Sequence, residues 1–472
     1  MGTCCPFALG SQGSAIRYKR YRRLDTATRG RSHARRPTRR TKDDPHAIRG
    51  SSSPIMSRAL ALSTTSLSST PTKESDSLFS PRQARHTNGD RHSPKSRIMK
   101  SPFGIYLHSP WCRTRCPYCA FNVQVNPNAD FESWRDALTT AWKHTATSLT
   151  GSAHSLYFGG GTPSLLPSKV IHHLIQTLPL ELNAEITVEA NPGTITTTGL
   201  EKLRNTGVNR LSLGIQTFNS KHAKRLGRGH NVRQARALLK DVHSIGFDSW
   251  SVDLMFALPN QTLDELKIDI DRLLALQPPH VSLYGLTIEP GTAYASAEKA
   301  GDLTLPESDT WRSMYDEIVM TLEKEGLERY EVSNFARPGH RGRHNEAIWR
   351  GGHYVGLGPG AHGFLPNGQR TWSHADIHEW LKNPQPIGVQ PTPHESAVDQ
   401  VLSSLRHVDG LNLYSLRASS GHEVDPSTIS QLKLGGLLTQ RGDHLQLTDT
   451  AFPIADGIVR RICDGLYLPK ST

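Results

Sequence analysis

Cysteine is scarce in this sequence, with six residues in a chain of 472. Three of the six are scattered, whereas the other three fall within eight positions, at Cys112, Cys116 and Cys119. So few cysteines do not build a disulfide framework. A close group of three indicates a metal site in a reducing compartment.

Long apolar runs are also missing, and hydrophobic residues make up only 36% of the chain. A helix that spans a bilayer needs about 20 consecutive apolar residues. We therefore expect no transmembrane segment.

Acidic residues are rare in the first hundred positions, which hold 21 Lys and Arg but only 6 Asp and Glu. The chain has 55 basic and 43 acidic residues in total, so the remainder has 34 and 37, a net charge of −3. The basic excess therefore belongs to residues 1–100, and the body offers no basic face for a nucleic acid.

Residues 1–100 are rich in Arg and Ser and have too little apolar sequence for a core. This composition is typical of an organellar transit segment, so we expect a disordered basic presequence and a mitochondrial protein. A plain disordered tail, or translation that begins at Met56 or Met99, is the alternative. The protein would then be cytoplasmic.

Short apolar runs and amphipathic stretches alternate from about residue 103. The apolar runs predict strands at Gly104–His108, Ser155–Phe158, Glu185–Glu189, Arg210–Ile215, Ser249–Phe256 and Val281–Leu286. The amphipathic stretches predict helices at Phe131–Thr147, Pro167–Leu178, Thr198–Thr206, Val232–Ile245 and Thr262–Leu276. Such repeated units form an α/β fold, here a partial (β/α)6 barrel over residues 101–335, with a doubly wound sheet as the alternative.

Two further regions follow the predicted barrel. Residues 336–390 are rich in His and Gly and show little periodicity, so we expect a connecting segment. Residues 391–472 predict three helices and a short hairpin, which resembles a winged-helix bundle. Because basic residues are sparse there, a lid or a protein-docking role is favoured over DNA binding.

The three clustered cysteines follow the first predicted strand, in a loop that Pro117 keeps from becoming a regular helix. Thiolates select zinc or an iron–sulfur cluster. A structural zinc ion would need a fourth ligand, for which His108 is the candidate. A 4Fe-4S cluster on three cysteines would instead leave one iron open for chemistry.

The spacing C-x3-C-x2-C after a first strand resembles the radical-SAM superfamily. The triplet Gly159-Gly160-Gly161 after the next strand is similar to the family's motif for the methionine end of S-adenosylmethionine (SAM). The resemblance implies that the cysteines bind a 4Fe-4S cluster, which reductively cleaves SAM. It implies SAM contacts from a set of residues near the strand ends: Tyr106, Tyr118, Gly160, Gly161, Thr162, Glu189, Gln216, Arg228 and Asp253.

The order of these motifs resembles the branch shared by oxygen-independent coproporphyrinogen III oxidases and HemW heme chaperones. The oxidases have a fourth cysteine where this chain has Phe121, as the chaperones do. The segment from His344 to Trp349 is similar to the chaperones' H-N-x-x-Y-W heme motif, but Ile348 replaces the tyrosine. The resemblance implies that His344 ligates heme iron, with His353 and His362 as weaker candidates.

Three functions remain open on this reading. A heme chaperone would bind heme and pass it to acceptor proteins such as respiratory hemoproteins, without turning over coproporphyrinogen. An oxidase would decarboxylate coproporphyrinogen III to protoporphyrinogen IX. A radical-SAM enzyme for another substrate, RNA included, is the third, although the body lacks a basic groove. Each of these three functions needs an electron donor. The sequence also leaves open whether the chain forms a homodimer.

Overall fold

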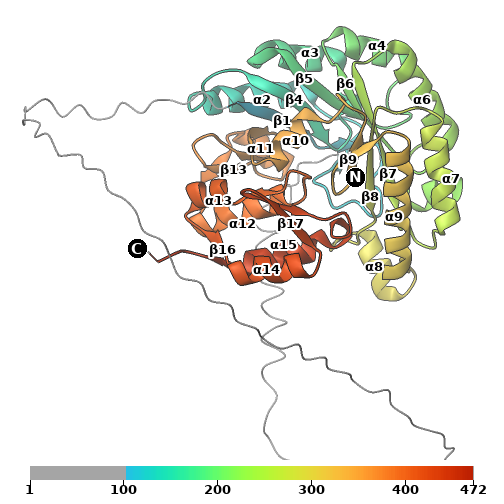
Figure 1. The fold of residues 1–472 in the computed structure, drawn as a ribbon. Coiled ribbons are helices and arrows are strands. Elements are labelled where there is room, and N and C mark those ends of the chain that lie inside the picture. The colour runs from blue at the N-terminus through green and yellow to red at the C-terminus, as the bar shows by residue number, and fades with distance from the viewer. Residues whose placement is uncertain (1–101, 471–472) are drawn as a thin grey trace, which may run out of the picture. The chain divides into compact units, whose positions relative to one another are not determined.

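The computed structural model describes residues 102–470, and Figure 1 shows how their elements are arranged. The predicted presequence lies outside the described residues. A twelve-stranded sheet organises the fold, in the order β14-β13-β12-β11-β1-β4-β5-β6-β7-β8-β10-β9. Its central strands are β1 (Phe103–Ser109), β4 (Ala153–Gly160), β5 (Leu180–Ala190), β6 (Arg210–Gln216), β7 (Ser249–Phe256) and β8 (His280–Gly285).

These six strands pair in parallel, each with the next. The connecting helices α2 (Phe131–Ala146), α3 (Ser168–Thr177), α4 (Thr197–Asn205), α6 (Val232–Ile245) and α7 (Leu263–Leu274) lie outside the curved sheet (Figure 1). A short helix, α5 (Ser220–Arg225), precedes α6. The predicted partial barrel of six strand–helix units is therefore confirmed.

Local sequence explains where these helices begin and end. The Asn231 side chain accepts from Gln234 N at the start of α6, and Gln234 reaches back to the Asn231 backbone. Thr262 and Glu265 form the same reciprocal cap on α7. Gly246 ends α6 in the left-handed conformation, at φ +75°. Such caps satisfy backbone groups that a helix end leaves unpaired.

Residues 336–390, expected to be an irregular connection, instead extend the sheet beyond β1. They supply α10 (Arg343–Trp349), β11 (His353–Leu357), β12 (His362–Phe364), β13 (Arg370–Trp372), α11 (Ile377–Lys382) and β14 (Ile387–Val389). On the opposite edge lie α8 (Ala293–Ala300), α9 (Ser308–Lys324), β9 (Glu328–Glu331) and β10 (Asn334–Ala336). Strands this short give too few residues for a period of two to be recognised.

The C-terminal region has the predicted helices and hairpin. They are α12 (Pro393–Ser404), α13 (Leu413–Ser420), α14 (Pro426–Leu434), β17 (Leu438–Arg441), β18 (His444–Leu447) and α15 (Ala455–Asp464). The fully buried Glu331 of β9 ties this region to the sheet, because Arg406 Nε donates to its Oε1 at 2.9 Å. Within residues 102–470, no helix is both long and apolar enough to cross a bilayer.

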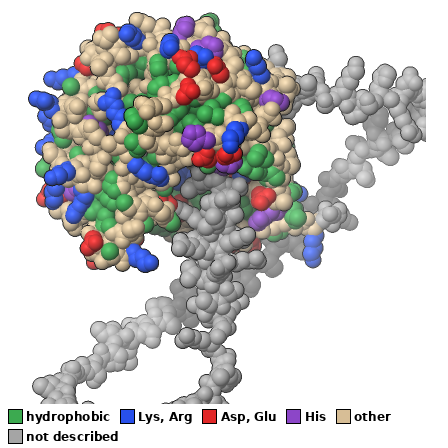
Figure 2. Space-filling model, turned by 180° about the vertical axis from the view of Figure 1, so that it is seen from behind, with side chains coloured by type: hydrophobic (Ala, Val, Ile, Leu, Met, Phe, Trp, Pro, Cys, Tyr) green, Lys and Arg blue, Asp and Glu red, His purple; other side chains and the backbone are tan. Residues whose placement is uncertain are grey.

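Charge on this body is mixed. Lys and Arg side chains form small groups among Asp and Glu on the face that Figure 2 shows, without a continuous basic surface there. This agrees with the net charge of −3 counted outside the first hundred residues.

Candidate cofactor pocket

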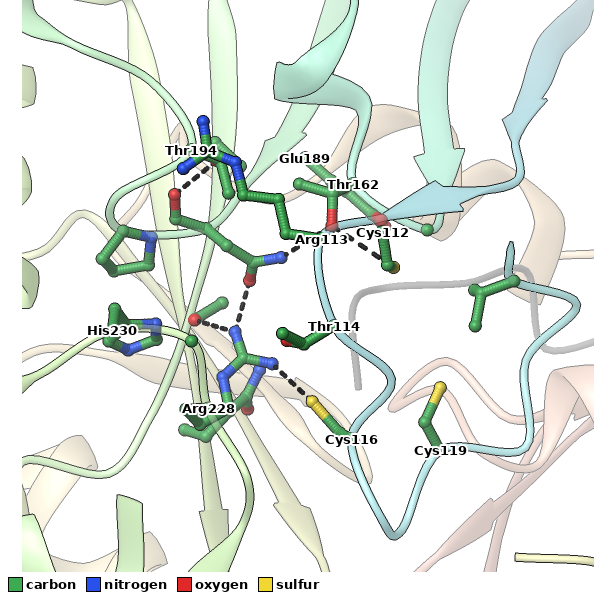
Figure 3. A pocket seen from close by; sticks show the side chains of 18 of the residues that line it. Cys112, Arg113, Thr114, Cys116, Cys119, Thr162, Glu189, Thr194, Arg228 and His230 are labelled. Atoms are coloured by element: carbon green, nitrogen blue, oxygen red, sulfur yellow. Dashed lines mark hydrogen bonds between the residues drawn. The ribbon is translucent and has the colours of Figure 1, made fainter. Parts of the chain in front are cut away.

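One pocket lies at the carboxyl ends of the parallel strands, where barrels of this kind place their ligands. The thiols of Cys112, Cys116 and Cys119 all line it (Figure 3). Cys112 ends the two-residue strand β2 (Trp111–Cys112), and a turn closed by Cys119 N donating to Cys116 O at 3.0 Å carries the others. The loop thus brings the three predicted ligands to one space.

Two of the thiols already have polar neighbours. Thr162 Oγ1 donates to Cys112 Sγ at 3.4 Å, and Arg228 Nη1 donates to Cys116 Sγ at 3.6 Å. Burial raises the pKa of the Cys112 thiol to about 11, and it raises the pKa of Cys119 as well. Binding a metal centre here would therefore release protons from these thiols.

The residue suggested as a fourth zinc ligand, His108, is already hydrogen-bonded. One ring nitrogen pairs with Tyr106 Oη at 3.0 Å and the other with Asn122 O at 2.9 Å. His108 is therefore not free to join a zinc ion, whereas a 4Fe-4S cluster needs only the three thiols that line the pocket.

The glycine triplet lets the backbone after β4 pass close to the cysteine loop. Gly160 has φ +112°, and a Cβ there would come within 2.6 Å of the His108 ring. A Cβ on Gly161 would lie 2.5 Å from Trp111 O. Only glycine avoids these contacts, so the triplet is needed for the pocket wall itself.

Four polar atoms of the pocket wall are buried without a hydrogen-bond partner among residues 102–470. They are Gln216 Oε1, Arg228 Nε, His230 Nε2 and Asp253 Oδ1. A buried polar group without a partner costs about 1–3 kcal/mol. Their shared position in one pocket indicates that a polar ligand completes them.

Burial also perturbs the pocket carboxyls. It raises the pKa of Glu189 to about 8, although Tyr157 Oη donates to Glu189 Oε1 at 2.8 Å. It raises the pKa of Asp253 too. Shifts of this kind are typical of functional sites.

Arg228 connects three parts of the wall. Its guanidinium donates to Gly214 O at 2.6 Å, to Tyr118 Oη at 3.3 Å and to the Asn191 side chain. These bonds hold the ends of β5 and β6 against the cysteine loop. The unpaired Nε remains for a ligand.

Most of the residues predicted to contact SAM meet in this pocket. Tyr118, Gly160, Gly161, Thr162, Glu189, Gln216, Arg228 and Asp253 line it. Tyr106 is not among the lining residues; its ring stacks on Tyr157 at 6.1 Å and bonds His108.

The sequence argument missed several lining side chains, among them Asn191 and His230. Asn191 Nδ2 donates to Thr162 Oγ1 at 3.1 Å, and His230 Nε2 is buried without a partner. Both lie in loops already singled out, two residues after Glu189 and two after Arg228. Their position in these strand-end loops is the sequence signal that could have identified them.

His344 lies apart from this pocket. It is 2% exposed, its Nδ1 bonds Ser155 Oγ at 2.8 Å, and its ring stacks on Tyr157 with centroids 5.2 Å apart. Burial lowers its pKa to about 3. The imidazole is therefore neutral, as an iron ligand must be, but enclosed.

Comparison with known proteins also indicates a radical-SAM protein. Residues 106–273 match the family model of the radical SAM superfamily. The chain is 37% identical to the heme chaperone HemW of Escherichia coli over 371 residues, which cover 75% of this chain and 96% of that one. It is also 37% identical, over 273 residues, to the zebrafish (Danio rerio) protein called radical S-adenosyl methionine domain-containing protein 1, mitochondrial, with 56% and 61% covered.

Among solved structures, the chain resembles the radical-SAM coproporphyrinogen III oxidase HemN of Escherichia coli. The TM-score is 0.67 at 23% sequence identity, with 78% of this chain and 91% of that chain covered. At this identity the likeness shows a shared fold.

Proposed function

Because this chain belongs to the HemW family of the radical-SAM superfamily, we propose that it is a heme chaperone. It binds a 4Fe-4S cluster through Cys112, Cys116 and Cys119, together with SAM, and it binds heme and delivers it to acceptor hemoproteins. The observation that carries the proposal is Phe121, which lines the cysteine pocket at the position of the oxidases' fourth cysteine.

The pocket supports the cluster and SAM parts of the proposal. Three thiols lie around one space, and the unpaired atoms of Gln216, Arg228 and Asp253 are suited to a polar ligand beside them. Held by Cys112, Cys116 and Cys119, a bound 4Fe-4S cluster would supply the electron for reductive cleavage of SAM. In this chain Arg228 is suited to a carboxylate of SAM and Asp253 to its ribose hydroxyls.

Heme binding is proposed from the family, since similar proteins are named heme chaperones. For His344 to reach iron, α10 has to leave its place, because the imidazole is enclosed by Ser155 and Tyr157. We retain His344 as the ligand that the motif predicts. Its test is separate from that of heme binding itself.

A second function is oxidative decarboxylation of coproporphyrinogen III, which the fold shared with HemN favours. We further propose a mitochondrial location, supported by the composition of residues 1–100 and by the mitochondrial zebrafish relative. The acceptor hemoproteins, an electron donor and a second copy of the chain are the proposed protein partners.

Anaerobic reconstitution tests the proposal, with iron and sulfide quantified before hemin is titrated. We expect about four irons and four sulfides per chain, one hemin bound, and no protoporphyrinogen IX from coproporphyrinogen III with reductant and SAM. Turnover would establish the oxidase instead. Zinc in place of iron and sulfide would refute both functions.

A further inference from the structure

The four strands β11–β14 extend the sheet from β1 to a free edge at β14, so the inner face of the barrel continues across them. Pairing places Tyr106 opposite Gly356, His362 opposite Trp372, and Trp372 opposite Ile387. A Cβ on Gly356 would meet the backbone of His362, so these two are also neighbours. Because residues opposite each other project to the same face, one row runs from the barrel interior to β14.

A second row lies beside the first. Phe364 stands opposite Tyr354 and Arg370, and Arg370 stands opposite Val389. At the open edge, Ile387 is 54% exposed and Val389 is 44% exposed. The two rows therefore form a face of apolar and aromatic side chains. Arg370 is the positively charged side chain on it.

His362 occupies the inner part of this face. Its imidazole is half-buried and makes no hydrogen bond to any residue of the described chain. The neighbouring Gly356 has no side chain, which lets the backbone of His362 pass directly over it. Burial lowers the pKa of His362, so its imidazole is neutral, and the ring lies near His108, whose Nε2 bonds Asn122 O in the cysteine loop. His362 thus lies between the cofactor pocket and the apolar edge.

We propose that this face, defined by His362, Trp372 and Ile387 with the row beside it, binds an iron porphyrin, and that His362 is an iron ligand. The inference rests on the proposed heme-binding function and names its site. A neutral imidazole suits heme iron. Trp372 and Ile387 match the flat apolar macrocycle, and a guanidinium such as that of Arg370 suits its carboxylates.

Arg370 already forms an ion pair with Asp399 of α12. A porphyrin carboxylate would therefore share or replace that partner, and α12 would form the boundary of the site. His344, in contrast, keeps its bond to Ser155 and its place against Tyr157. Ile348 of α10 packs on Tyr354 and Phe364 of the second row, so the ligand would lie on the first row, from His362 to Ile387.

The experiment is hemin titration of the full chain, followed by the Soret band. We expect His362→Ala to weaken hemin binding at least tenfold and to displace the Soret maximum. Ile387→Asp should weaken binding about fivefold while the maximum stays at the wild-type wavelength. His243→Ala is the matched control, because it removes an exposed imidazole from α6 on the outside of the barrel. Circular dichroism melts check that each variant folds.

The outcomes separate this inference from the proposed function. A wild-type chain that binds no hemin refutes the function. Wild-type binding with an unchanged affinity and Soret maximum in His362→Ala refutes only the site, and a shift in His344→Ala alone assigns the iron to α10. If Ile387→Asp alters the sedimentation coefficient but not hemin affinity, the face is a self-association surface and the inference is wrong.

Discussion

Replacing Asp269 tests whether the outer helix α7 holds the pocket loop after β6. Gln216, which lines the pocket, has φ +70°, a conformation that costs a non-glycine residue about 1–2 kcal/mol. The pairing of β6 with β7 also shifts register between Gly214 and Gln216. Asp269 accepts from Phe218 N at 3.1 Å and from the Thr217 hydroxyl. The carboxylate therefore holds the turn that aims Gln216 into the pocket.

Asp269→Ala leaves two buried donors unpaired, since Thr217 and Phe218 are each 1% exposed. At about 1–3 kcal/mol for each donor, we expect a loss of roughly 2–6 kcal/mol of unfolding free energy. If Gln216 also loses its orientation, one ligand hydrogen bond of about 1 kcal/mol disappears, which weakens SAM binding about fivefold. Asp269→Asn keeps an acceptor for Phe218 N and should lose less than half as much stability.

Urea denaturation gives the unfolding free energy, and calorimetric titration of the reconstituted protein gives the SAM affinity. In the Asp269→Ala background, Gln216→Gly relieves the positive φ and should recover about 1 kcal/mol of stability without recovering affinity. Wild-type SAM affinity in Asp269→Ala would show that Asp269 only stabilises the fold. Equal losses in the alanine and asparagine variants would refute the hydrogen-bonding argument.

Three further predictions concern the cluster, His344 and α10. Cys116→Ser should abolish cluster reconstitution, measured as bound iron, whereas Cys463→Ser in α15 should keep the wild-type iron content. His344 has its pKa lowered from 6.5 to about 3 by burial, so its contribution to stability is complete above pH 6.5 and is lost as pH falls toward 3. About 2 kcal/mol should be lost between pH 6.5 and 5, and denaturation curves of His344→Gln should lack that part of the pH dependence. Hydrogen exchange in Arg343–Trp349 should be unchanged by hemin if His362 is the ligand, and faster if His344 leaves its place.

The partial barrel could be predicted from the sequence because its strands are buried and its helices amphipathic. Ser249–Phe256 and Val232–Ile245 were predicted to the residue. The resemblance to the radical-SAM superfamily named eight of the lining residues, Asp253 and Arg228 included. Ligands of parallel barrel strands gather at one edge, and strand-end position agreed with the resemblance for Glu189, Gln216 and Asp253.

The parts of the fold that the sequence did not predict depend on contacts between segments that are distant along the chain. Strands of three residues such as His362–Phe364 are stabilised by their partners across the sheet and carry no period of their own. Tyr106 was expected in the pocket from the family resemblance, but its side chain packs against Tyr157 and does not line the pocket. A sequence motif specifies a residue type but not how deeply its side chain is buried. The burial of His344 could therefore not be predicted.

The surroundings of α10 show how much a role for His344 in iron binding would cost. Glu185 accepts from Arg343 N at 2.9 Å and from His344 N at 3.1 Å, so a buried carboxylate holds the first turn. Hydrogen bonds to a charged group contribute about 1.5–3 kcal/mol each, so moving this turn costs roughly 3–6 kcal/mol before iron is bound. At the other end, Glu346 pairs with Arg350, which also bonds Asp409 next to α12. Ligation by His344 would therefore loosen these contacts of α10 to the C-terminal region, whereas ligation by His362 would involve only the Arg370–Asp399 pair with α12.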